Sequence, residues 1–263
     1  MTAYSKPRHI WRALWPVLAF FGIQIIGGVI LLTGLVAHHG DEALYWLAEN
    51  SMFLSTFTAA AMIALYLPLW QGTKESHPTL NGGKVSKKSI VFTVGLFLGL
   101  NLLLSSIMEL TRVVEFFPGT IEHHEALFAG GGLILRIVMI GFLAGIIEEL
   151  LFRGVLLNRL TEWMPTWAAV LISSIVFGLV HMDPFQILYA TFMGLIFAWS
   201  YIRTKNLWIP IVGHVVFNMT SVLLGYYMEV TGTEISSVIL LIPSVILTVA
   251  CMVLIQKIPL KDE

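Results

Sequence analysis

The chain has 263 residues, of which 57% are hydrophobic and only 12% charged, with a mean hydropathy of +0.84. A soluble domain carries about 25% charged residues, so this composition excludes an ordinary water-soluble protein. The one cysteine, Cys251, lies in the last apolar run and excludes an intrachain disulfide. The formal net charge of −1 does not identify a partner, and we expect no nucleic acid to bind.

Apolar runs of about twenty residues, long enough to cross ~30 Å of hydrocarbon, recur along the chain. They predict an all-α fold, a polytopic membrane helical bundle, because the bilayer core leaves exposed backbone groups unsatisfied. The first run is too long for the apolar region of a signal peptide, so we expect it to be a span. The chain shows no repeat, which predicts a single integral membrane domain over residues 1–263. About eight transmembrane helices are expected, at residues 11–37, 51–70, 88–108, 131–153, 166–182, 185–202, 206–226 and 236–256.

The distribution of basic residues predicts the orientation of these helices. If the N-terminus lies in the cytoplasm, all 15 Lys and Arg residues except Arg112 and Arg136 fall on the cytoplasmic side. Basic residues accumulate on that side of membrane proteins, so both termini are predicted to be cytoplasmic. We expect a multi-pass protein of a bacterial inner (plasma) membrane, in contact with the lipid bilayer.

Two adjacent carboxylates lie inside an apolar helix in the stretch 142–153, FLAGIIEELLFR. An ionisable side chain at membrane depth is costly and is therefore a candidate functional residue. Glu149 and Arg153 stand four residues apart, so they face each other and are predicted to form an ion pair. Glu148 points about 100° away around the helix and has no partner in its own segment. A buried carboxylate of this kind is suited to act as a general base.

Two histidines and one asparagine lie in later apolar runs. His181 ends the fifth span, and His214 and Asn218 stand at positions i and i+4 of the seventh. Counted at ~1.5 Å per residue from the cytoplasmic side, these side chains lie about 14 to 22 Å deep. Glu148 reaches about 22 Å only if its helix extends beyond the apolar run. Residues 154–163 contain no proline, so we predict one long helix that ends near residue 162.

Three motifs in this order resemble the signature of the CAAX-protease and bacteriocin-processing family (CPBP, or Abi), a family of intramembrane glutamic endopeptidases. They are Glu148-Glu149-x-x-x-Arg153, Phe177-x-x-x-His181 and His214-x-x-x-Asn218. Each motif is weak alone, but the ordered set is specific. The resemblance covers about residues 135–225, which would form a catalytic core within the membrane domain. The first three spans match nothing specific.

By this resemblance, the chain would be an endopeptidase that hydrolyses a peptide bond of a membrane-associated peptide or protein. Glu148 would activate a water molecule, and His181 would orient that water or share its proton. His214 and Asn218 would stabilise the oxyanion. Neutral hydrogen-bond donors beside a buried base are also what amide hydrolysis requires on chemical grounds.

The same resemblance gives Glu149 and Arg153 supporting roles and implies no metal or other cofactor. The family is named for prenylated C-terminal peptides, but nothing in the sequence identifies a prenyl-binding groove. The substrate and the cleavage site are therefore left open.

The residues alone leave other functions open. Glu148, His181 and His214 form a three-ligand set that would suit a zinc-dependent membrane hydrolase. Buried acids and histidines also form the proton relays of transporters, although such folds often show two related halves, which are absent here. A catalytically silent scaffold or immunity protein is a further alternative. The Glu-His-His-Glu cluster at residues 122–125 has no standard metal-site spacing.

Overall fold

Long apolar helices make up nearly all of the computed structural model, which describes residues 6–76, 78–121, 132–233 and 235–258. Seven of them are α1 (Lys6–His39), α2 (Ala43–Ser76), α4 (Lys87–Thr111), α9 (Thr166–Leu179), α10 (Pro184–Thr204), α11 (Trp208–Thr231) and α12 (Ser237–Gln256). Short pieces join some of them: η1 (Gly40–Glu42), α3 (Pro78–Asn81) and η2 (Val113–Phe116). With the helix over residues 133–160, each predicted span corresponds to a helix. No strand occurs in the described ranges, so the all-α prediction is confirmed.

The helix that carries the glutamates is continuous over residues 133–160, and we call it the glutamate helix. It consists of α6 (Leu133–Arg136), the π-helical η3 (Ile137–Ala144), α7 (Gly145–Glu149), the π-helical η4 (Leu150–Leu157) and α8 (Asn158–Leu160). The predicted extension of this helix is confirmed, with its end at residue 160. The sequence does not indicate the two π-helical segments, because an apolar run looks the same in either winding.

Within the described residues, five helices are long and apolar enough to cross a membrane alone: Pro7–Glu42, α4, α10, α11 and α12. α9 is apolar but has only 14 residues, a rise of about 21 Å against ~30 Å of hydrocarbon. The turn after α9, which contains His181, therefore lies inside the membrane-spanning region. Asp183 holds this turn by accepting hydrogen bonds from Gln186 N and Thr120 Oγ1. The chain is a multi-pass integral membrane protein.

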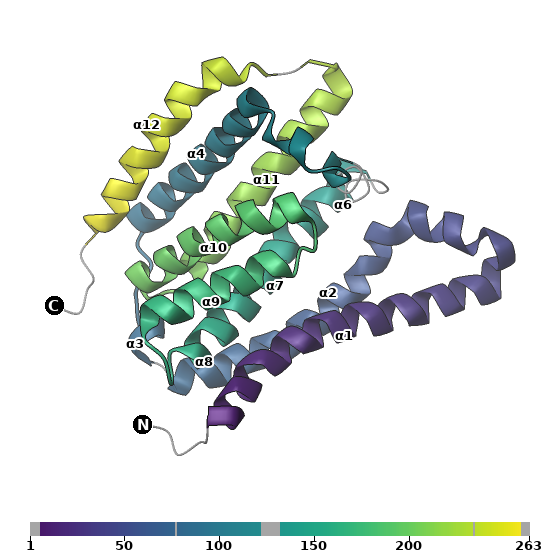
Figure 1. Ribbon diagram of the computed structural model, residues 1–263, viewed down its shortest axis with the longest axis horizontal. Helices are drawn as coiled ribbons and strands as arrows, with labels where there is room; N and C mark the ends of the chain where they lie inside the picture. The colour runs from purple at the N-terminus through teal and green to yellow at the C-terminus, as the bar shows by residue number, and fades with distance from the viewer. Residues whose placement is uncertain (1–5, 77, 122–131, 234, 259–263) are drawn as a thin grey trace.

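The helices are arranged so that the beginning of α1 and the end of α12 lie at the same end of the bundle (Figure 1). The connections from α1 to α2 and from α11 to α12 lie at the opposite end. This arrangement agrees with the prediction that both termini are on one side of the membrane. α1 and α2 pack side by side as a hairpin that contacts the glutamate helix and diverges from the bundle at its connecting end.

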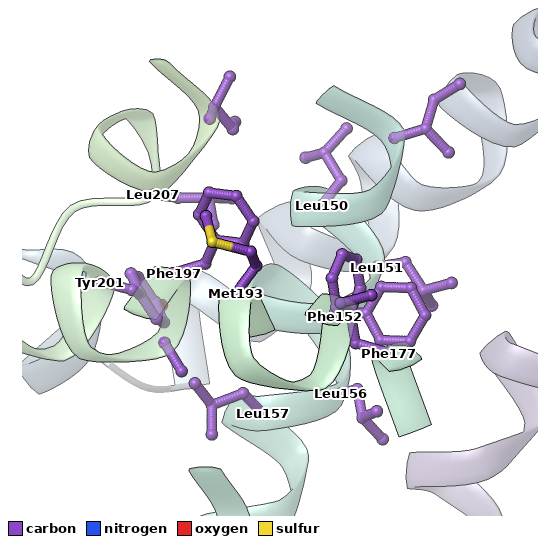
Figure 2. Packing of buried hydrophobic residues seen from close by; sticks show 14 of the residues in the cluster. Leu150, Leu151, Phe152, Leu156, Leu157, Phe177, Met193, Phe197, Tyr201 and Leu207 are labelled. Carbon is purple, nitrogen blue, oxygen red and sulfur yellow. The ribbon is translucent and has the colours of Figure 1, made fainter. Parts of the chain in front are cut away.

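The buried core surrounds the second half of the glutamate helix. Every residue of η4 is buried, and Phe152 packs edge-on against Phe177 of α9. Figure 2 shows this packing, in which Phe197 and Tyr201 of α10 lie beside η4. One hydrophobic cluster contains residues of α1, α2, α4, the glutamate helix and α9 to α12. The single domain over residues 1–263 and its catalytic core over residues 135–225 stay predictions.

Candidate active site

The centre of the site is a fully buried ion pair. Glu149 and Arg153 are both 0% exposed, and Arg153 Nη1 donates to Glu149 Oε1 at 2.8 Å. Arg153 Nη2 donates to the carbonyl oxygen of Gly194 at 2.9 Å, and the guanidinium lies 4.5 Å from the centre of the Phe177 ring. A buried pair tolerates desolvation only with good geometry and further contacts. The carbonyl and the aromatic ring supply those contacts, so the structure contains the ion pair that the spacing predicts.

His214 of α11 connects the two glutamates. Its Nδ1 lies 3.0 Å from Glu149 Oε1, and its Nε2 lies 3.7 Å from Glu148 Oε2. The first contact is a hydrogen bond that Nδ1–H donates to the carboxylate. The second is too long for a direct hydrogen bond. The imidazole also stacks on Phe197, with ring centres 4.4 Å apart, so its orientation is fixed from two directions.

Two glycines allow α11 to approach the glutamate helix this closely. A Cβ atom at Gly145 would lie 3.3 Å from His214 Cγ and from the backbone nitrogen of Val215. At Gly141, a Cβ atom would meet Met219 Cε at 3.0 Å. Small residues four apart are typical of close helix contacts in membranes. The contact places the backbone of α11 directly against the turn that bears the glutamates.

Glu148 is the more open of the two carboxylates. Its side chain is 18% exposed, whereas that of Glu149 is fully buried. Its ion-pair partner within the described part of the chain is His214, at the longer 3.7 Å distance. One carboxylate is therefore enclosed and neutralised by Arg153, and its neighbour in sequence remains accessible.

His181 is held by the helix that precedes it. Its Nδ1 lies 2.8 Å from the carbonyl oxygen of Phe177. A carbonyl oxygen can only accept, so Nδ1 carries the proton and Nε2 is the basic nitrogen of the neutral ring. The Phe177 ring contacts His181 and His214 edge-on, with ring centres 5.1 and 5.9 Å apart. Both histidines of the predicted site therefore surround one aromatic ring.

Asn218 is oriented by the first π-helical segment. Its Nδ2 donates to the carbonyl oxygen of Ile140 at 3.1 Å, which leaves the second N–H of the amide for another acceptor. From the other side, Asn101 of α4 donates to the Phe217 carbonyl oxygen at 3.0 Å and to Ser221 Oγ at 2.7 Å. Our sequence analysis did not identify Asn101. The signal was available, because a polar residue within an apolar run needs a partner.

The described residues contain no group of three or more His, Cys, Asp or Glu side chains that could hold a metal ion. Glu148, His181 and His214, the set considered for zinc, do not form such a group. The cluster at residues 122–125 lies outside the described residues. Independence from cofactors stays a prediction, and chelation is the experiment that addresses it.

Comparison with known proteins gives two similarities. Residues 130–220 match the family model described as "Type II CAAX prenyl endopeptidase Rce1-like", a segment that contains every residue of the candidate site. A stretch of 110 residues is 36% identical to a Bacillus subtilis (strain 168) protein named "Putative membrane peptidase YdiL" and covers 40% of this chain. The match covers 45% of that protein, so the chain spans about half the length of the curated relative it matches. No solved structure shows significant similarity to the chain.

Proposed function

We propose that the chain is an intramembrane endopeptidase with Glu148 as its general base, because residues 130–220 match the Type II CAAX prenyl endopeptidase Rce1-like family model. The observation that carries this proposal is the asymmetry of the two carboxylates. Glu149 is sealed between Arg153 and His214, whereas Glu148 is partly exposed beside a histidine. Only the accessible carboxylate can meet a water molecule and a substrate.

The proposed reaction is hydrolysis of a peptide bond. Glu148 takes a proton from water, and the resulting hydroxide adds to the carbonyl carbon of the scissile bond. Glu148 then returns the proton to the amide nitrogen, the C–N bond breaks, and a carboxylic acid and an amine leave. His181 Nε2, as an acceptor, helps to orient the water. General acid–base catalysis of this kind contributes about 10²- to 10⁴-fold to the rate.

The oxyanion of the intermediate needs hydrogen-bond donors. Asn218 has one N–H left after its bond to Ile140. His214 can donate from Nε2 only as an imidazolium, because its Nδ1–H already donates to Glu149. Glu149 orients the imidazole through that hydrogen bond, which is the supporting role proposed for it. Loss of one such donor typically costs about 10²- to 10³-fold in rate.

The substrate class that fits this site is a membrane-associated peptide or protein. His214 and Asn218 lie on α11, which is long and apolar enough to cross a membrane, so a substrate must reach them at membrane depth. A zinc-dependent hydrolase and a catalytically silent scaffold or immunity protein are the alternatives. Each makes a different prediction in the experiment below.

The test compares membrane peptidomes of cells that carry the wild-type chain, Glu148→Gln or Glu115→Gln. Glu115 is a matched control because it is an exposed glutamate outside the site. Peptides that disappear with Glu148→Gln and persist with Glu115→Gln are expected. The same peptides in all three strains would contradict an enzymatic role for Glu148 and favour the silent alternative. Purified protein that loses the activity in a chelator, and regains it with zinc, would favour the metal-dependent alternative.

A further inference from the structure

A buried asparagine, C-terminal to the glutamates, donates hydrogen bonds to the backbone of η4. Asn158 is 0% exposed, and its Nδ2 lies 2.9 Å from the carbonyl oxygens of both Arg153 and Gly154. A side-chain amide has two N–H groups, so it can serve both the backbone and a further acceptor. The residue lies in the part of the chain that carries the site, but it belongs to none of the three sequence motifs.

These carbonyl oxygens lie where the winding of the helix changes from π to α. The π-helical segment ends at Leu157, and the backbone N–H of Asn158 donates to the Val155 carbonyl oxygen. In a regular α-helix, that N–H would donate to the Gly154 carbonyl oxygen. At the junction the side chain of Asn158 donates to the Gly154 carbonyl oxygen in place of its own backbone N–H.

A second contact fixes the amide of Asn158 itself. The hydroxyl of Tyr201, which lies on α10, is 2.8 Å from Asn158 Nδ2 and 2.8 Å from Asn81 Oδ1. The hydroxyl accepts from the first and donates to the second, so both of its hydrogen-bonding roles are used. Figure 2 shows Tyr201 beside Leu157 at the end of η4. Hydrogen bonds thus join the end of η4 to Tyr201 of α10 and, through Tyr201, to Asn81 of α3, which lies between α2 and α4.

We propose that Asn158 is a positioning residue for the reaction, an inference that rests on the proposed function. Asn158 donates to the carbonyl oxygen of Arg153 and so fixes the π turn at that residue. The guanidinium of Arg153 donates to Glu149, and Glu149 accepts a hydrogen bond from His214. A π turn that moves along a helix changes the direction of each residue it passes by on the order of 100°. Release of the turn would therefore misdirect Arg153 and loosen the bond between Glu149 and His214.

The first test reads the site without any substrate. In the full-length protein labelled with ¹⁵N-histidine, the His214 resonances are assigned by their absence from His214→Gln. We expect Asn158→Leu, which is similar in size but has no donor, to shift the Nδ1 resonance of His214. The control is Ser106→Ala, which removes another buried side-chain bond to a backbone carbonyl, on α4, and should leave the resonance unchanged. A folded Asn158→Leu protein with a wild-type His214 resonance would overturn the proposal.

The second test uses Asn158→Asp and remains available if the leucine variant does not fold. An aspartate has no donor when ionised and one O–H donor when protonated. The measured quantity is the release of Glu148-dependent peptides by Asn158→Asp, divided by that of wild type at the same pH. At high pH this ratio should be about ten- to 100-fold below one, which is the size of effect that misplaced catalytic groups produce. The ratio should rise again as the pH is lowered. A ratio that is low and independent of pH would overturn the proposal. If no peptide depends on Glu148, the proposed function fails, and the His214 resonance still decides whether Asn158 positions the pair.

Discussion

At the scale of single residues, Arg153 holds three parts of the molecule together. It donates to Glu149 in its own helix and to the carbonyl oxygen of Gly194 in α10, and it lies on the ring of Phe177 in α9. A lysine could replace the charge but not the two divergent donors of a planar guanidinium. The residue therefore contributes to stability and to the arrangement of the site together.

Arg153→Ala is expected to reduce stability and activity together. The substitution leaves Glu149 buried without a cation, which typically costs about 3–5 kcal/mol. Protein yield in membranes and the thermal unfolding temperature of the purified protein would measure the loss. Arg153→Lys should fall between Arg153→Ala and wild type.

The control is an arginine with a weak and exposed partner. Arg112 lies 3.7 Å from Glu115, and both side chains are more than half exposed. Surface ion pairs contribute about 0–1 kcal/mol, so Arg112→Ala should change neither yield nor unfolding temperature. A well-expressed and fully active Arg153→Ala protein would show that the buried pair is dispensable.

At the scale of helices, a proline in α1 explains how the N-terminal hairpin is attached to the glutamate helix. Pro16 has no N–H, so the carbonyl oxygen of Arg12 lacks its normal helical donor. Arg159 Nη1 donates to that oxygen at 2.5 Å, and Arg12 Nη1 donates to Glu162 at 3.0 Å. On the other side, Tyr66 of α2 donates to the Pro16 carbonyl oxygen at 2.9 Å. The interruption of the backbone hydrogen bonds of α1 at Pro16 is therefore the place where the glutamate helix and α2 bind to α1.

This arrangement predicts a coupling between residues 16 and 159. Arg159→Ala removes the side-chain donor from the Arg12 carbonyl oxygen and should lower the free energy of unfolding by about 1–3 kcal/mol. In a Pro16→Ala background, the helix regains its own N–H donor, so Arg159→Ala should cost clearly less. Thermal unfolding of the four proteins of this cycle measures the difference. An equal cost in both backgrounds would mean that Arg159 acts through another contact.

At the scale of the whole molecule, exposed tryptophans mark one boundary of the membrane. Trp11 lies near the start of α1, Trp163 lies in the turn before α9, Trp167 lies near the start of α9, and Trp208 begins α11. All four are at least one-third exposed. Tryptophan is enriched where the membrane meets water, and basic residues predict that this end faces the cytoplasm. The helices that carry the site begin or end at this boundary.

A site for hydrolysis must be reached by water, and we expect access from the cytoplasmic side. Val212→Cys or Val215→Cys, introduced beside His214 after Cys251→Ser, should react with a membrane-impermeant thiol reagent applied from the cytoplasm at one position or both. The same reagent applied from outside should not react, because we expect the close contact of α11 with Gly141 and Gly145 to close that side. Arg112→Cys, on the predicted outer side, should show the reverse labelling. Labelling of the valine positions from outside alone would reverse the predicted topology.

Much of the fold and part of the site can be predicted from the sequence, for reasons that are local. Length and apolarity predict eight helices because a bilayer permits few alternatives. The four-residue spacing of Glu149 and Arg153 predicts their ion pair, since that spacing places side chains on one face. Polar residues within apolar runs, such as His214, can be recognised as candidate site residues because each one is costly to bury.

Only the tertiary structure shows which face of each helix lies inward, and this determines how the site residues are enclosed. In a membrane, the lipid-facing side chains are as apolar as the buried ones, so the sequence of η4 reveals neither its packing nor its π winding. The enclosure of Glu149 rests on a hydrogen bond to His214, 65 residues further along the chain. The exposure of Glu148 and the backbone contacts of Asn158 likewise follow from how the helices rotate and cross. The local sequence therefore determines where helices form, whereas the different burial of the two adjacent glutamates results from packing between distant segments.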